Sequence, residues 1–201
     1  MKTLTDHINE ALKIGKNISE WSVYSCQPKT KDELKEIIEV RIVKDGNKCD
    51  LNDIDTSLIT DMSKLFFMSD FNGDISKWDV SNVKDMNDMF NNSEFNGDVS
   101  EWNTSKVEDM SFVFANSPFN GDISKWNTSK VRNMWFMFSN SDFNKDISKW
   151  DVSRVKDMNS MFRHSKFNQN ISSWKINKDC DTTNMFDDCP IRKEYKPVLP
   201  E

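Results

Sequence analysis

Three Asn-Gly-Asp triplets are the residues of this chain that come nearest to a metal site. They are Asn72-Gly73-Asp74, Asn96-Gly97-Asp98 and Asn120-Gly121-Asp122, each 24 residues after the last. Stacked Asp and Asn oxygens suit a calcium ion, but the same residues also form turns in which Asp accepts a backbone amide. The fourth copy places Lys145 at the glycine position. Since a cation there disfavours an ion, we favour the turn and predict no metal and no cofactor.

Other residues with catalytic potential form no recognisable arrangement. The two histidines, His7 and His164, have no cysteine or serine arrangement around them, which argues against a His-centred catalytic site. The five glycines form no phosphate-binding loop, and none of the common catalytic motifs is present. We therefore predict that the protein is not an enzyme.

The four cysteines lie outside the regular repeats, two towards each end of the sequence. They are Cys26, Cys49, Cys180 and Cys189. Their spacings match no common zinc pattern. In a reducing compartment we expect free thiols packed in the end caps.

Composition excludes several classes of function. The 201 residues carry a net charge of −6, and the 30% of charged residues mix both signs along the chain, which argues against a nucleic-acid partner. No stretch is apolar enough to insert into a membrane. The first residues do not form a secretory signal or a lipid-anchor site, so we expect a cytoplasmic protein as synthesised, with a virion as the alternative location.

Five sets of large apolar residues recur at the same interval of 24 residues. A fixed period of this length indicates a repeat protein, in which each unit is stable only when stacked on its neighbours. The sets are Phe66, Phe90, Phe114, Phe138, Phe162 and Phe186; Phe71, Phe95, Phe119, Phe143 and Phe167; Ile75, Val99, Ile123, Ile147 and Ile171; Trp78, Trp102, Trp126, Trp150 and Trp174; and Met62, Met86, Met110, Met134 and Met158, with Val83, Val107, Val131 and Val155 between the last two.

Each repeat divides into two patterns. "DISKWDV" nearly alternates apolar and polar residues, which predicts a short strand with a bend at Trp78. "SNVKDMNDMF" spaces Val83, Met86 and Phe90 by three and four residues, which predicts a short helical or 3-10 turn. Neighbouring strands would then stack into a narrow parallel sheet, giving an α/β repeat fold.

The segment "ISKWDVSNVKDMNDMF" resembles the repeat of BspA-like leucine-rich-repeat proteins, a mycoplasma-lipoprotein-type repeat that phages also carry. The resemblance covers about 28–196. It implies a leucine-rich-repeat-like solenoid of short parallel strands and short helical or 3-10 turns, usually on a cell surface and used in adhesion or recognition. It supplies no catalytic residues.

The two ends of the repeat array differ from its middle. Thr30 and Glu33 read as a capping box for a helix that Gly46 ends. We therefore predict four parts: an amphipathic segment at 1–27, a cap helix at 28–50, the solenoid at 51–178 with a degenerate first repeat, and a C-terminal cap and tail at 179–201.

Departures from the repeat are where function can reside. The two positions after each repeated Met are usually small or polar, as in Ser63-Lys64 and Asn87-Asp88, but two adjacent repeats carry Phe112 and Trp135-Phe136. If these positions face solvent, the three aromatics form an apolar patch. We predict a protein-interaction or recognition module that binds an unidentified protein here. The alternatives are local repacking, or cover by the N-terminal segment.

The first eleven residues suggest a different class of function. "MKTLTDHINEA" places Leu4 and Ile8 on one face of a helix. It resembles the capsid-targeting peptides of large tailed phages, which a protease cuts after Glu, here between Glu10 and Ala11. The alternative function is therefore a phage-encoded structural or packaged protein. A helix that docks on the N-terminal end of the repeats explains the same pattern.

Mass spectrometry of purified virions tests the packaging alternative. Cleavage predicts a mature chain that begins at Ala11, because the apolar-x-Glu context ends at Glu10. A virion-associated chain that still begins at Met1 would contradict it.

Overall fold

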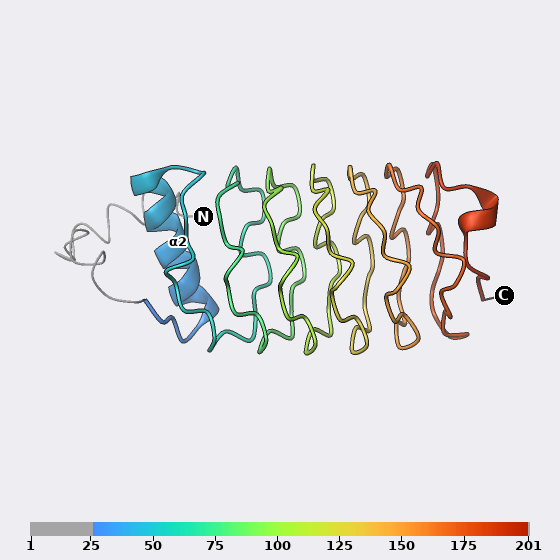
Figure 1. Ribbon diagram of the computed structural model, residues 1–201, viewed down its shortest axis with the longest axis horizontal. Helices are drawn as coiled ribbons and strands as arrows, with labels where there is room; N and C mark the ends of the chain where they lie inside the picture. Colours follow the sequence, from blue (N-terminus) through green and yellow to red (C-terminus); the bar gives the residue numbers. More distant parts are fainter. Residues whose placement is uncertain (1–25, 201) are drawn as a thin grey trace.

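The repeats stack side by side into one elongated column, with each 24-residue repeat forming one coil (Figure 1). The computed structural model describes residues 26–200. Within this range it has one α-helix, α2 (Lys31–Asp45), and one 3-10 helix, η2 (Lys193–Tyr195). Helix α2 lies across the N-terminal end of the column and η2 at the opposite end (Figure 1). All other described residues form turns, bends and extended connections.

The predicted α/β solenoid of parallel strands is wrong. Neighbouring coils meet only at isolated parallel bridges such as Asp61↔Asp85 and Asp85↔Asp109, and residues 26–200 contain no strand and no sheet. The segment predicted as a strand turns back on itself, because the amide of Trp78 bonds the carbonyl of Ile75 at 3.1 Å and that of Val83 bonds Val80 at 2.9 Å. The sequence alternation therefore reports turns with one buried side.

The segment predicted as helical is a run of tight turns. In the first coil the amide of Leu65 bonds the carbonyl of Met62, and that of Ser69 bonds Phe66. The third residue of each turn has a positive φ, 59° at Lys64 and 54° at Met68, as a type II turn requires. Left-handed residues interrupt helix and strand alike, so neither element forms. The same two positions are left-handed in every coil: Lys64, Asp88, Phe112, Phe136, Ser160 and Asn184, then Met68, Asn92, Asn116, Asn140, His164 and Asp188.

These turns align the backbone for hydrogen bonds between coils. Alternate amides of one coil donate to alternate carbonyls of the next, with the same register at each junction. The first junction joins Met62, Lys64, Phe66 and Met68 to Asp85, Asn87, Met89 and Asn91 at 2.9–3.0 Å, and the last joins Met158, Ser160, Phe162 and His164 to Asp181, Thr183, Met185 and Asp187 at 2.8–3.0 Å. The coils thus obtain the backbone pairing of a parallel sheet without extended strands.

The repeated apolar residues form the core, as their spacing predicts. The Phe rings stack along the column, with 5.4 Å between the centroids of Phe66 and Phe90 and 6.3 Å between those of Phe71 and Phe95. Each repeated Trp is also buried and donates its indole N–H to a carbonyl of the preceding coil, as Trp126 does to Val99 at 3.0 Å. The tryptophans therefore stabilise the stack by burial and by a satisfied polar group.

Helix α2 closes the N-terminal end of the core, as its sequence predicts. The Thr30 side chain accepts a hydrogen bond from the amide of Glu33 at 3.2 Å, and Gly46 ends the helix at φ 86°. The Glu33 carboxylate returns its bond to the amide of Lys29, one residue earlier than a capping box requires. Leu34, Ile37 and Ile38 are buried against the first coils.

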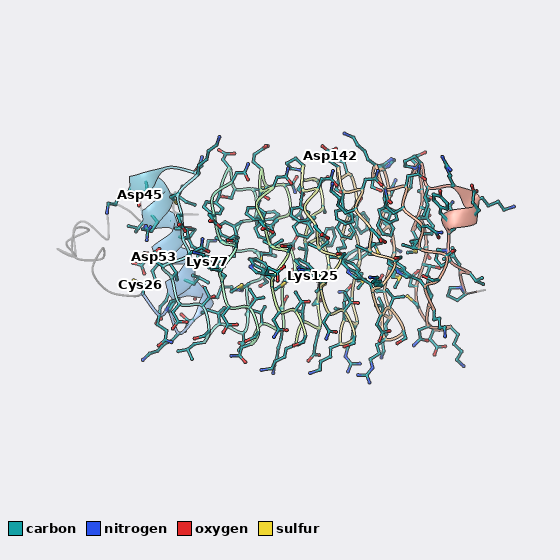
Figure 2. All side chains as sticks on the ribbon, viewed as in Figure 1. Cys26, Asp45, Asp53, Lys77, Lys125 and Asp142 are labelled. Atoms are coloured by element: carbon teal, nitrogen blue, oxygen red, sulfur yellow. The ribbon has the colours of Figure 1, made fainter. Side chains whose placement is uncertain are left out.

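An arginine fastens α2 to the first coil. Arg41 contacts the carboxylates of Asp45 at 3.0 Å and Asp53 at 2.8 Å, and it donates to the carbonyl of Asp50. Asp45 and Asp53 both lie at the α2 end of the column (Figure 2). Because α2 and the coil share this cation, the helix is fixed in rotation as well as in position.

Asparagine side chains reinforce the stack. The Asn120 Oδ1 accepts a hydrogen bond from the amide of Asn144 at 2.9 Å, and the same bond recurs between every pair of coils from Asn72 to Arg192. We predict that Asn120→Ala lowers the free energy of unfolding by about 1–2 kcal/mol, because a half-buried amide loses its acceptor. Urea denaturation followed by circular dichroism measures this. Lys130→Ala, an exposed change one coil segment away, should leave stability unchanged; an equal effect of the two would contradict the assignment.

Candidate recognition surface

The three aromatic residues that break the repeat lie together on adjacent coils. The rings of Phe112 and Phe136 stack with centroids 5.1 Å apart and planes 9° from parallel. Trp135 meets both of them edge-on, at 4.9 Å from Phe112 and 5.3 Å from Phe136. We call these three residues the aromatic cluster. The structure therefore brings together the residues that the sequence singles out, while their role in binding stays a prediction.

The aromatic cluster reaches the surface but is not fully exposed. Trp135 is 41% exposed, whereas Phe112 and Phe136 are half-buried. The neighbouring position of the Phe112 coil, Ser111, is buried. The expectation that both positions after each repeated Met face solvent thus holds for Trp135 and only in part for the two phenylalanines.

The backbone of the cluster is in an unusual conformation. Phe112 has φ 56° and Phe136 has φ 54°, a region that bulky residues rarely adopt. The equivalent positions in other coils include Asp88 and Asn184, and short polar residues of this kind tolerate the left-handed region better. The repeat therefore imposes the conformation, and the two phenylalanines occupy it at an energetic cost.

A column of acidic residues runs beside the cluster. Asp61, Asp85, Asp109, Asn133, Asp157 and Asp181 occupy equivalent positions and form the bridges between coils. We call them the Asp column. Each side-chain oxygen accepts a hydrogen bond from the amide two residues later, for example Ser111 to Asp109 at 2.8 Å and Trp135 to Asn133 at 3.0 Å. The column therefore holds the backbone from which the cluster projects.

Asn133 replaces an aspartate at the cluster itself. Its Nδ2 donates to the Oδ2 of Asp109 at 3.0 Å, while its Oδ1 accepts from the amide of Trp135. One side chain thus connects the Asp109 carboxylate to the backbone of the most exposed aromatic residue. The substitution also interrupts the row of like charges at this point.

Burial and like charges set the electrostatics of the Asp column. Burial raises the pKa of the Asp85 carboxyl; the Asn87 amide opposes this, and the charges of Asp109 and Asp61 add to it. Burial likewise raises the pKa of Asp157, with Asp181 adding to it. These carboxylates are therefore held close together with little compensating positive charge.

The first member of the column does have a cation. Lys31 of α2 places its Nζ 2.8 Å from the Asp61 Oδ2 and 2.8 Å from the Ser63 Oγ. Burial alone would raise the pKa of Asp61, but the hydrogen bonds from Lys31 and Ser63 outweigh it and hold that pKa below its usual range. The pair shows how an ammonium group fits an Asp of this column.

The Asn-Gly-Asp triplets act in the backbone, as the turn interpretation predicts. The Asp122 Oδ1 accepts from the Ser124 amide at 2.9 Å, and that bond is the main reason its pKa lies below the usual range. A Cβ on Gly73 would lie 2.1 Å from the Cys49 carbonyl, so glycine is required there. Within residues 26–200 no three His, Cys, Asp or Glu side chains are grouped to hold a metal.

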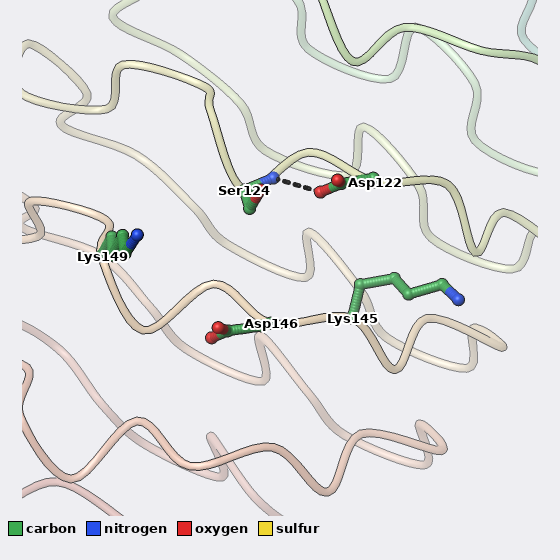
Figure 3. Close-up of a pocket in the computed structure, with 5 residues that line it drawn as sticks. All are labelled: Asp122, Ser124, Lys145, Asp146 and Lys149. Atoms are coloured by element: carbon green, nitrogen blue, oxygen red, sulfur yellow. Dashed lines mark hydrogen bonds between the residues drawn. The ribbon is translucent and has the colours of Figure 1, made fainter.

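A polar cavity of about 370 Å³ opens where Lys145 replaces the repeated glycine (Figure 3). Asp122, Ser124, Asp146 and Lys149 complete its lining. The Asp122 carboxylate points to the Ser124 amide, and the Lys145 side chain extends away from Asp146 (Figure 3). Since the Asp146 carboxylate similarly caps Ser148, the carboxylates of this cavity are already used by the backbone.

The cysteines are free thiols, as their positions predict. Cys49 and Cys180 are buried, and Cys26 and Cys189 are partly buried. Burial raises the pKa of Cys180 to about 11, with help from the charges of Asp157 and Asp181. This thiol is therefore protonated at neutral pH, and only a thiolate is a strong nucleophile.

Sequence reasoning missed two exposed apolar residues, Phe67 and Met68, which are 38% and 67% exposed. They occupy the positions of Asn91 and Asn92 in the next coil, so the same comparison of repeats could have found them. They do not contact the aromatic cluster through any ring pair. The predicted cleavage residues Glu10 and Ala11 lie outside the described residues, and cleavage stays a prediction.

The stacked coils define the class of protein, a repeat protein with one surface that departs from the repeat. Residues 39–140 and 94–195 match a family described as "Mycoplasma protein of unknown function, DUF285". The two matches overlap and together span more than half of the chain, which therefore belongs to this family. The mycoplasma-type repeat seen in the sequence is confirmed at that level. No curated protein and no solved structure matches the chain. Among residues 26–200 there is no helix with the length and apolar character to span a membrane.

The raised pKa of Asp85 leads to a prediction on stability. We expect Asp85→Asn to raise the free energy of unfolding at neutral pH by a few tenths of a kcal/mol, because the half-buried charge is screened by solvent. The amide keeps an oxygen for the Asn87 backbone, as Asn133 does for Trp135. The folded-state pKa lies above the unfolded one, so the charge destabilises the fold only at and above the pH range where Asp85 ionises.

Urea denaturation at neutral pH and at about pH 3 measures this difference. The gain should disappear at the acidic pH, where Asp85 is protonated in the wild type as well. The reciprocal change Asn133→Asp should lower stability at neutral pH. A loss of stability from Asp85→Asn at neutral pH would contradict the assignment.

Proposed function

We propose that this chain is a non-enzymatic protein-recognition module, and that it binds its partner through Phe112, Trp135 and Phe136. The carrying observation is that two of these aromatics occupy left-handed positions at the surface. The repeats act as the scaffold. The resemblance to repeats used in adhesion and recognition supports the same class of function.

Energetics argue against a purely structural role for the cluster. A left-handed backbone costs a residue with a Cβ about 1–2 kcal/mol, and the packing of an aromatic pair returns about 0.5–1.5 kcal/mol. Phe112 and Phe136 also leave part of their apolar surface in contact with water. Their contribution to folding is therefore close to neutral, and the apolar surface becomes useful when a partner covers it.

The scaffold also holds the cluster rigidly. The Phe112 amide bonds the Trp135 carbonyl at 2.9 Å, and the Phe136 amide bonds the Asn159 carbonyl at 3.1 Å. Each aromatic residue is thus fixed to the next coil through its own backbone. A preorganised aromatic surface loses little conformational entropy on binding, and Trp in particular is enriched at the energetic centres of interfaces.

A peptide selection tests the proposal. Random peptides of about 12 residues, long enough to cover such a surface, are displayed on phage and selected against the wild-type chain. We expect the selected peptides to bind the triple variant Phe112→Asn, Trp135→Asn, Phe136→Asn at least tenfold more weakly, a loss of about 1.4 kcal/mol or more. Isothermal titration calorimetry measures the affinities.

The matched control is the double variant Phe67→Asn, Met68→Asn, which removes the other exposed apolar pair. It should bind the same peptides as tightly as the wild type. Peptides that bind the triple variant with unchanged affinity would overturn the proposal.

Stability provides a second and independent prediction. We expect Phe112→Asn to change the free energy of unfolding by less than about 1 kcal/mol, because Asn suits a left-handed backbone. Phe114→Ala, two residues away and fully buried, should cost about 3–5 kcal/mol. Urea denaturation compares the two. If Phe112→Asn were as damaging as Phe114→Ala, the cluster would be part of the core.

A further inference from the structure

The chain already contains one cation bound to the Asp column. The ammonium of Lys31 lies between the Asp61 carboxylate and the Ser63 hydroxyl, 2.8 Å from each. Ser63 stands two residues after Asp61, so the two acceptors belong to a position that recurs in every coil. The pair from α2 is therefore a structural template for how a basic side chain docks on the column.

The equivalent acceptors near the aromatic cluster hold no such cation. Asp109 and Ser111 are the direct counterparts of Asp61 and Ser63 in the coil of Phe112. Within residues 26–200 no Lys or Arg forms an ion pair with Asp85 or Asp109. Asp85 is half-buried between two other carboxylates. Negative charge on this part of the column is thus left uncompensated.

Nearby charged side chains do not fill the position. Arg132 faces Glu108 at 3.7 Å, and Lys64 faces Asp88 at 3.9 Å, both as exposed pairs. Asn133 supplies a neutral donor to one oxygen of Asp109. That same asparagine bonds the Trp135 backbone, so the uncompensated carboxylate and the aromatic cluster are connected through a single side chain.

We propose that the partner presents a lysine or arginine next to an apolar side chain, with the cation on Asp85 and Asp109 and the apolar group on the aromatic cluster. This inference rests on the proposed function. The stem of a long basic side chain packs on apolar surface while its charge stays at the edge. An adjacent aromatic ring attracts the cation in addition. The partner is thus a basic, partly apolar protein segment.

The composition of selected peptides tests the inference. Peptides selected on the wild type should be enriched in a Lys or Arg beside an apolar residue. The tightest of them is then synthesised, together with its Lys/Arg→Gln form, and titrated into three chains: the wild type, the variant Asp85→Asn with Asp109→Asn, and a charge control. We expect the Gln form to bind the wild type about tenfold more weakly, and the double variant to lose the same factor for the basic peptide only.

The charge control is Glu36→Gln with Glu94→Gln. Both glutamates are exposed, and the change alters the net charge from −6 to −4, as the aspartate variant does. The control should bind the basic peptide within about twofold of the wild type at physiological salt, since exposed charges at a distance are screened. The aspartate variant retains its fold because Asn133 already occupies the column.

The outcomes separate this inference from the function on which it rests. Peptides that depend on the aromatic cluster but show no basic enrichment, and that bind the aspartate variant normally, would overturn the inference and leave the proposed function standing. Equal weakening by the aspartate variant and the charge control would overturn it as well. Peptides that ignore the aromatic cluster would overturn the proposed function itself.

Discussion

The backbone hydrogen bonds between coils are the interaction on which the rest of this structure depends. Four alternate amides of each coil donate to four carbonyls of the next, in one register from the coil of Met62 to that of His164. This register requires two left-handed residues in every coil. The repeat length, the absence of strands among the described residues and the alignment of side chains into columns all follow from it.

A fixed register makes the surface easy to vary and hard to move. A side chain in one coil lies beside its counterpart 24 residues later, so one or two substitutions change a continuous patch. Phe112 and Phe136 form a stacked pair only because the register places them on adjacent coils. The same register aligns carboxylates that would otherwise avoid one another, as at Asp85 and Asp109. Recognition and electrostatic cost therefore have one structural origin.

The sequence predicted what depends on side-chain burial. The period, the buried Phe, Trp and Met sets, helix α2 with its Thr30 cap, and the meeting of Phe112, Trp135 and Phe136 all follow from which residues recur and which do not. It did not predict the backbone, because "DISKWDV" buries alternate side chains whether the chain extends or turns. The left-handed positions had no glycine to reveal them: Lys64, Asp88 and Ser160 stand there. The pairing of Lys31 with Asp61 needed the relative placement of α2 and the first coil.

Photo-crosslinking tests the central claim that the aromatic cluster is the surface that contacts a partner. The photoreactive amino acid p-benzoylphenylalanine replaces Trp135 in one chain and Phe67 in another, and each is irradiated with a peptide selected on the wild type. Both positions are exposed and apolar, but only Trp135 belongs to the cluster. The account predicts a covalent product from position 135 and little from position 67. A product from position 67 alone would contradict it.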